Sequence, residues 1–208
     1  MANHQQDLKK EWFMKSKIDY HAPFVTLWLS CNSWYNFHYG LANDREHINE
    51  IKRDTSNKNK VYIAFKNLLE SGNPKERANI YNCIEQLHYA LIQAELVYSG
   101  NNIPNNSKMS LSNALMDFNA NPKIFENLII DNAKTKSGKL KNQFASAHGL
   151  GTLVLNNDSQ KIFAGLFEVI YQVRCHLVHG SLEPNDKNHE VARYCYLILF
   201  ECLKGFCG

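Results

Sequence analysis

Hydrophobic and polar residues follow one another along this chain with the three- and four-residue spacing of amphipathic helices. The clearest pattern begins at Asp158 and ends at Gly180. Its apolar positions fall on one stripe of a helix and comprise Ile162, Leu166, Val169, Ile170, Val173 and Leu177. Asp158 or Ser159 is suited to cap the start, and Gly180 is suited to end the helix in a left-handed conformation. The pattern predicts a helix over residues 158–180.

The same periodicity predicts helices along most of the remaining chain. The stretches with the clearest start and stop signals are residues 6–18, 23–39, 43–53, 60–70, 73–97 and 186–206. Shorter helices are expected at 111–118 and 122–132, and a short strand or extended segment at 149–158. Residues 1–208 are therefore expected to form one all-α domain, a helical bundle with a loop-rich insertion at about residues 99–158.

Composition narrows the class of protein. The chain has 208 residues, of which 44% are hydrophobic and 21% charged, as in ordinary soluble globular proteins. Six cysteines occur without a CxxC pair, and no signal peptide is recognisable, which favours a reduced, cytoplasmic protein. No apolar run reaches the roughly 18 residues of a membrane span, so no membrane association is expected.

The net charge of the chain gives no indication of a binding partner, whereas one local cluster of charges does. The net charge is only +3, so the composition does not indicate a nucleic-acid-binding protein. Lysines gather, however, in the sequence AKTKSGKLKNQ at residues 133–143. They are Lys134, Lys136, Lys139 and Lys141. Such a run is either a solvated face or a mobile basic loop that holds RNA phosphates, to which each lysine adds salt-sensitive affinity.

Three polar residues near the end of the 158–180 helix lie beside the apolar stripe or beyond it. They are Arg174, His176 and His179. Packing does not require them. Structural roles remain open for each, since Arg174 is within reach of an ion pair with Glu168 or Glu183, and a histidine at a helix C-terminus is favoured by the helix dipole. The alternative is that these residues carry chemistry.

The sequence VRCHLVHG resembles the motif of HEPN domains, in which an arginine is followed by four to six residues and then a histidine near the end of a helix. Here the pair is Arg174 and His179, with four residues between them. The wider run EVIYQVRCHLVHGSLEP and the hydrophobic last helix extend the resemblance. It implies an up-and-down helical bundle, a metal-independent endoribonuclease with Arg174 and His179 as catalytic residues, and a homodimer whose two motifs line one cleft.

The chemistry that the resemblance implies is consistent with these side chains. RNA carries its own nucleophile, the 2′-hydroxyl, so the protein has to move protons and stabilise charge on the phosphate. A histidine, with an ordinary pKa of about 6.5, suits proton transfer, and an arginine grips two phosphate oxygens. Five residues along a helix turn about 140°, so Arg174 and His179 do not share a face of a straight helix, and a composite dimer site is expected.

His176 is a candidate supporting residue, through a hydrogen bond to phosphate or to His179. As a metal pair, His176 and His179 lack a third ligand at a recognisable spacing, so neither a metal nor another cofactor is expected.

The family's settings, toxin–antitoxin pairs and antiviral phage defence, imply an RNA-cleaving effector that an antitoxin or regulatory partner protein restrains. Two alternatives remain. One is a catalytically inactive HEPN-like module that binds RNA, nucleotide or protein, favoured by Cys175 where catalytic members often have a polar residue. The other is an interaction protein whose aromatic segment 28–39 contacts a partner. That segment is also a candidate base-stacking surface, although core packing is the commoner role of such residues.

Overall fold

The structure is a computed structural model that describes residues 18–119 and 124–207. The helix expected at residues 6–18 lies outside these residues, apart from Ile18. The described chain is mostly helical, which confirms the helical class. Two small two-stranded sheets depart from a purely all-α fold.

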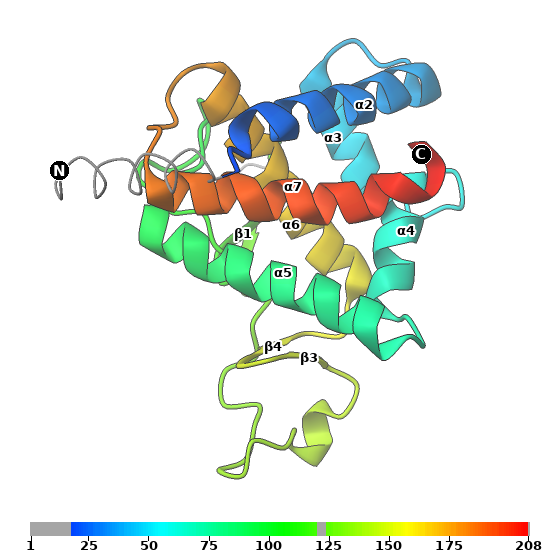
Figure 1. Cartoon of the computed structure of the whole chain (residues 1–208), viewed down its shortest axis with the longest axis vertical. Coiled ribbons are helices and arrows are strands. Elements are labelled where there is room, and N and C mark those ends of the chain that lie inside the picture. The colour runs from blue at the N-terminus through cyan, green and yellow to red at the C-terminus, as the bar shows by residue number, and fades with distance from the viewer. Residues whose placement is uncertain (1–17, 120–123, 208) are drawn as a thin grey trace, which may run out of the picture.

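Six α-helices make up the described bundle, and their bounds are α2 His21–Tyr39, α3 Asp44–Arg53, α4 Lys60–Leu69, α5 Pro74–Ala94, α6 Ser159–Val178 and α7 Asp186–Cys207 (Figure 1). Between α5 and α6 lie the strands β1 Ala114–Asp117, β2 Ile124–Glu126, β3 His148–Leu150 and β4 Leu153–Leu155, with a short 3₁₀ helix at Asn142–Phe144. This interval corresponds to the predicted insertion.

Local capping explains why the predicted helix starts are accurate. The side chains of Asn43, Asn59, Asn73 and Asp158 each accept a hydrogen bond from a backbone N–H in the first turn of the following helix. These bonds satisfy donors that have no partner inside the helix. The starts of α3, α4, α5 and α6 therefore follow from signals within a few residues of sequence.

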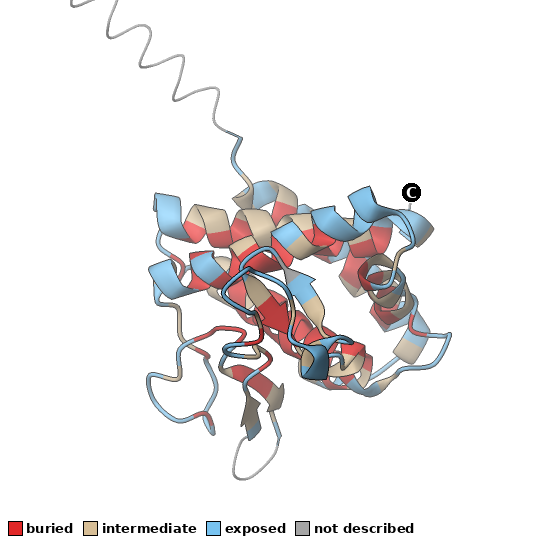
Figure 2. Ribbon diagram, turned by 90° about the horizontal axis from the view of Figure 1, so that it is seen from below, coloured by how far each residue is buried: buried red, intermediate tan, exposed pale blue. Residues whose placement is uncertain are grey.

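Helix α6 lies at the centre of the fold. It packs against α2, α3, α4 and β1, while α7 covers α5, α2 and α4. Every residue from Ile162 to Val173 is buried, so α6 is enclosed on all sides and not only along the predicted stripe. Figure 2 shows the buried residues on the inward faces of the helices around it. The polar residues that remain on α6 therefore require partners or exposure at its ends.

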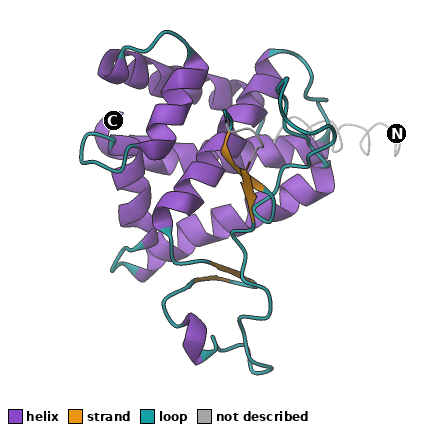
Figure 3. Ribbon diagram, turned by 180° about the vertical axis from the view of Figure 1, so that it is seen from behind, coloured by secondary structure: helices purple, strands orange, loops and turns teal. Residues whose placement is uncertain are grey.

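The helices expected at residues 111–118 and 122–132 are wrong. The chain forms the antiparallel pair β1–β2 there, with Ala114 opposite Glu126 and Leu115 opposite Phe125 (Figure 3). Ala114 and Leu115 are fully buried, and β1 packs directly on α6. The expected extended segment at 149–158 is confirmed in part by the β3–β4 hairpin.

Candidate active site

The C-terminal end of α6 carries the residues that the sequence singles out. Gly180 follows the helix with φ of +69°, a left-handed conformation that costs glycine little. The N–H groups of Ser181 and Leu182 return to the His176 carbonyl at 2.9 and 3.1 Å. His179 occupies the C-cap and is exposed. Its imidazole has no hydrogen-bond partner within the described residues.

Arg174 lies five residues earlier and is held more firmly. Its side chain is 18% exposed, and its Nη2 lies 3.5 Å from Oδ2 of Asp44 at the start of α3. Its Cζ lies 5.8 Å from the centroid of the Trp28 ring. The ion pairs considered from sequence, with Glu168 or Glu183, are not formed. Asp44, 130 positions away along the chain, takes their place.

Asp44 joins three helices at this point. Its Oδ1 accepts hydrogen bonds from Nδ2 of Asn32, at 3.1 Å, and from the Tyr35 hydroxyl, at 3.0 Å. Burial raises the pKa of Tyr35 above its ordinary value, so the hydroxyl remains a hydrogen-bond donor at neutral pH. Arg174 is therefore oriented by a carboxylate that α2 side chains themselves fix in place.

Arg174 and His179 do not meet within one chain. No hydrogen bond joins their side chains, and the helical turn between them directs them to different sides of α6. Both are nevertheless at the same end of one helix, where Arg174 is partly exposed and His179 is exposed.

His176 has a different environment from His179. Its Nε2 lies 2.8 Å from the Val97 carbonyl, and its Nδ1 lies 2.8 Å from Oγ of Ser181. Both ring nitrogens are thus occupied, and they connect the segment after α5 to the turn after α6. His176 supports the shape of the helix end, whereas contact with a phosphate would require one of these bonds to break. The described residues contain no group of three or more His, Cys, Asp or Glu side chains placed to hold a metal ion.

A buried ion cluster at the middle of α6 was not identified from sequence. Glu168 on α6 is 0% exposed, and its Oε2 accepts from Nη1 of Arg45 and Nζ of Lys52, both at 2.8 Å. Its Oε1 accepts from Nε2 of Gln172 at 3.0 Å. Glu168 and Gln172, four residues apart in a helix with a strong apolar pattern, were the available signal, because a buried charge requires a partner.

The cluster keeps Glu168 ionised. Burial alone would raise the pKa of Glu168, but the charges and hydrogen bonds of Lys52 and Arg45 hold that pKa below its ordinary value. Burial lowers the pKa of Lys52, an effect that the charge of Glu168 opposes. We take the group as charged, since a carboxylate with three donors is well solvated by the protein.

Arg45 extends the cluster to the surface. Its Cζ lies 3.7 Å from the Phe118 ring centroid and 4.4 Å from that of Tyr171, so two aromatic rings and Glu168 fix the guanidinium. Its neighbour Asp44 binds Arg174. Two consecutive residues at the start of α3 thus contact α6, since Asp44 pairs with Arg174 near its C-terminal end and Arg45 pairs with Glu168 at its middle.

The four lysines lie elsewhere. They sit on a hairpin in which Lys134 bridges to Leu140, close to β3 and β4. This hairpin belongs to the segment that leads into the N-terminal end of α6, whereas Arg174 and His179 are at the C-terminal end (Figure 1). One chain therefore does not bring the lysines and the motif into one site. Lys134 also differs from the other three lysines, since its amino group donates a hydrogen bond to the Gly151 carbonyl.

The aromatic segment of α2 is chiefly core. Trp28 and Tyr35 are buried, and Trp34 packs between His38 and Phe206. Phe37, in contrast, is 94% exposed. Core packing is confirmed for Trp28 and Tyr35. Phe37 is the exposed aromatic residue of this segment that remains a candidate for base stacking or partner contact.

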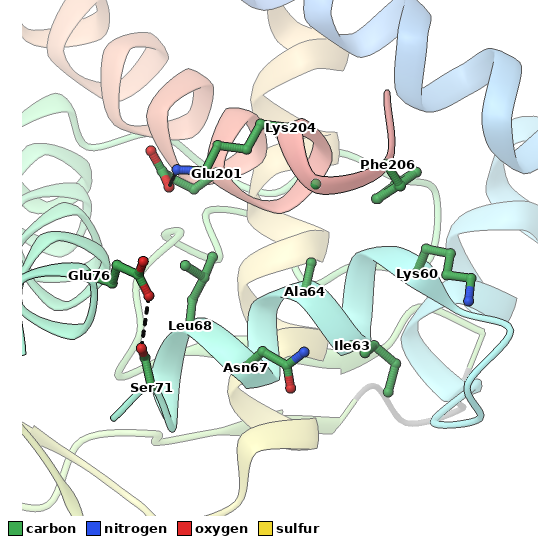
Figure 4. Close-up of a pocket in the computed structure, with 11 residues that line it drawn as sticks. Lys60, Ile63, Ala64, Asn67, Leu68, Ser71, Glu76, Glu201, Lys204 and Phe206 are labelled. Carbon is green, nitrogen blue, oxygen red and sulfur yellow. Dashed lines mark hydrogen bonds and ion pairs between the residues drawn. The ribbon is translucent and has the colours of Figure 1, made fainter. Parts of the chain in front are cut away.

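A separate cleft of about 450 Å³ lies between α4 and the end of α7 (Figure 4). Ala64, Leu68 and Phe206 contribute its apolar side chains, and Glu76 accepts a hydrogen bond from Ser71 at its edge. None of the candidate residues from the sequence lines this cleft. Its chemistry is unrelated to the motif.

All six cysteines are free. Burial raises the pKa of Cys83 to about 11 and that of Cys202 to about 12, so these thiols are protonated and unreactive at neutral pH. Cys175, beside Arg174, is half-buried. Cys83 and Cys202 therefore provide no activated nucleophile.

No helix in residues 18–119 and 124–207 combines the length and hydrophobicity needed to cross a membrane.

Comparison with known proteins gives no relative for this chain, since no family model, no curated protein and no solved structure matches it.

Proposed function

We propose that this protein is a HEPN-like endoribonuclease that cleaves RNA without a metal, with Arg174 and His179 as the catalytic residues. The observation that carries the proposal is the state of the two side chains. His179 is exposed and has no hydrogen-bond partner among the described residues, and Arg174, at the same helix end, pairs with Asp44 while its side chain remains 18% exposed. These states suit an exposed group for proton transfer and an oriented cation for a phosphate.

The proposed reaction uses the RNA's own 2′-hydroxyl. His179 takes the proton from this hydroxyl or returns one to the leaving 5′-oxygen, and Arg174 stabilises the charge that develops on the phosphate. The 2′-oxygen forms a new bond to phosphorus as the bond to the 5′-oxygen breaks. The products are a 2′,3′-cyclic phosphate and a 5′-hydroxyl, so the atoms balance without water or an ion.

We propose a homodimer because one chain does not place Arg174 and His179 together. Two α6 ends related by a two-fold axis would supply two copies of each residue to one cleft. Arg45, which lies against the rings of Phe118 and Tyr171, would add a second oriented cation at each edge of this cleft. In the HEPN setting, such an enzyme is a cytoplasmic toxin or phage-defence effector under the control of an antitoxin or other regulatory partner.

The test is incubation of the purified protein with tRNA or total RNA in EDTA. Cleavage by the native protein is expected, and His179→Ala and Arg174→Ala are each expected to lower the rate by about 10²–10⁴-fold. His189→Ala, at a half-buried histidine on α7 outside the motif, is the matched control and should keep full activity. Cleavage that needs a divalent ion, or that both substitutions leave unchanged, contradicts the proposal.

The composite site has its own test. Mixing the Arg174→Ala and His179→Ala proteins under conditions that allow subunit exchange is expected to restore part of the activity, because the mixed dimer retains one arginine and one histidine. Activity that stays absent although mixed dimers form would contradict a shared cleft.

The second candidate function is a catalytically inactive module that binds RNA or a partner protein. The ion pair between Arg174 and Asp44 favours it, since a paired arginine has a structural role without catalysis. In that case Arg174→Ala would reduce stability, and His179→Ala would leave RNA or partner binding unchanged.

A further inference from the structure

Positive charge is concentrated in one segment of the chain. Residues 132–157, which we name the basic appendage, contain four lysines and no aspartate or glutamate. Because the whole chain carries +3, the rest of it carries a net −1. The weak overall charge therefore conceals a local +4 confined to one-eighth of the sequence.

Three of these lysines are available to a ligand. Lys136, Lys139 and Lys141 are exposed, and none forms an ion pair or hydrogen bond through its amino group within the described chain. Lys139 and Lys141 are two positions apart on one arm of the hairpin, so their side chains leave the same face. Lys134 is excluded because it binds the Gly151 carbonyl.

The appendage is anchored firmly at its base. The Glu85 carboxylate on α5 accepts hydrogen bonds from the N–H groups of Thr152, at 2.7 Å, and Leu153, at 3.3 Å. Gly151 has φ of +37°, a left-handed conformation that favours glycine, and a Cβ there would displace the Glu85 carboxylate. Tyr81 and His148 add a further contact of 2.9 Å. The lysines are thus presented from a fixed support.

The appendage and the motif are at opposite ends of α6. The chain leaves β4 at Leu155 and enters α6 at Ser159, whereas Arg174 and His179 lie at the other end (Figure 1). A 20-residue helix is about 30 Å long. A dinucleotide at the motif therefore cannot touch the appendage.

We propose that the basic appendage binds the phosphate backbone of RNA at a site separate from the motif, and that the substrate is a folded RNA long enough to contact both. The second part rests on the proposed ribonuclease activity. Unpaired lysines bind the negatively charged phosphate backbone of a nucleic acid through electrostatic attraction, and they do so without contacting the bases that carry the sequence. A folded RNA of tRNA size spans the roughly 30 Å between the two ends.

Nucleic acid is favoured over an anionic membrane by what the appendage lacks. Basic segments that bind membranes commonly add exposed apolar or aromatic side chains that enter the lipid. The large exposed hydrophobic residues of the described chain all lie outside residues 132–157. A basic segment without an exposed apolar anchor therefore favours a phosphate backbone over a membrane surface as its partner.

The experiment compares the triple variant Lys136→Glu, Lys139→Glu, Lys141→Glu with a charge-matched control, Lys58→Glu, Lys60→Glu, Lys75→Glu. All six lysines are exposed. Affinity for tRNA is measured by fluorescence anisotropy over a range of salt concentrations, and cleavage is measured on tRNA and on a tetranucleotide. The appendage variant is expected to bind tRNA about ten- to a hundredfold more weakly, with a salt slope lower by about 2–3. It should cleave tRNA more slowly and the tetranucleotide at the native rate.

The possible outcomes separate the two proposals. Equal tRNA affinity in the native protein and the appendage variant overturns the appendage site, as does lysine-dependent binding to phosphatidylserine vesicles without binding to RNA. An equal loss in the control variant also overturns it, since the effect would then follow total charge. Lysine-dependent tRNA binding without any cleavage supports the appendage site and overturns the ribonuclease.

Discussion

The two ends of α6 hold their cations in opposite ways. At the C-terminal end, Arg174 pairs with Asp44, while Arg45 and Lys52 share Glu168 halfway along the helix. At the N-terminal end, the basic appendage presents lysines that have no acidic neighbour within 26 consecutive residues, 132–157. A cation that is ion-paired or stacked on an aromatic ring is held in one orientation, which suits contact with a single phosphate. An unpaired lysine can instead contact the phosphate backbone of a nucleic acid of any sequence. The two ends therefore differ in how cations are held, with one oriented arginine at the motif and a cluster of unpaired lysines on the appendage.

The largest effect is expected from Glu168→Gln. This change leaves the charges of Lys52, 3% exposed, and Arg45 without a buried anion, so the free energy of unfolding should fall by about 3–5 kcal/mol. Urea denaturation measures the loss. Glu190→Gln, which removes a surface pair with Arg193, serves as the control and should cost less than about 1 kcal/mol. Equal losses in the two variants would refute a special role for the buried cluster.

The support of the basic appendage should weaken in acid. Burial lowers the pKa values of His88 on α5 and His148 on β3, so the unfolded chain binds protons that the folded chain resists. Stability is complete above the ordinary histidine pKa and falls as pH drops below it, by no more than about 1.4 kcal/mol per pH unit for His88. His148 is more exposed to water and contributes less.

Hydrogen exchange at pH 7.5 and 5.5 locates this effect. Protection of β3 and β4 is expected to decrease at the lower pH more than protection of the last turns of α6. In a His88→Phe, His148→Phe protein the difference between the two pH values should diminish. A uniform decrease in the native protein would contradict a local weakness at the appendage.

The smallest change in stability is expected from Asp44→Asn. The pair with Arg174 is partly exposed, with a distance of 3.5 Å, so its removal should cost about 1 kcal/mol or less. The asparagine oxygen can still accept from Asn32 and Tyr35. Under the proposed function, RNA cleavage should nevertheless fall by more than the stability does, because Arg174 loses its orientation. Unchanged cleavage would assign Asp44 a purely structural role.

Local signals made the helices predictable from sequence. Asn43, Asn73 and Asp158 cap helices whose starts they mark, and Gly180 follows the end of α6 as expected. The β1–β2 pair was missed because its strands are only three and four residues long and are stabilised by burial against α6. Strands this short have no periodicity that distinguishes them from a turn of helix.

The candidate site was predictable only in part. Sequence indicates Arg174, His176 and His179 as polar residues beside an apolar stripe, and it cannot distinguish the exposed His179 from the doubly bonded His176. Asp44 and Arg45 were not foreseen, since they approach α6 across more than 100 residues of chain. Contacts of that separation depend on the tertiary fold and have no local pattern.

The most direct test of the account is the chemistry of the RNA ends made in EDTA by the native protein and by His179→Ala. End-group labelling and mass spectrometry of cleaved tRNA are expected to give 2′,3′-cyclic phosphates and 5′-hydroxyls with the native protein, and a yield lower by about 10²-fold or more with the variant. Ends of another type, or the same yield from both proteins, would contradict catalysis by the C-terminal end of α6.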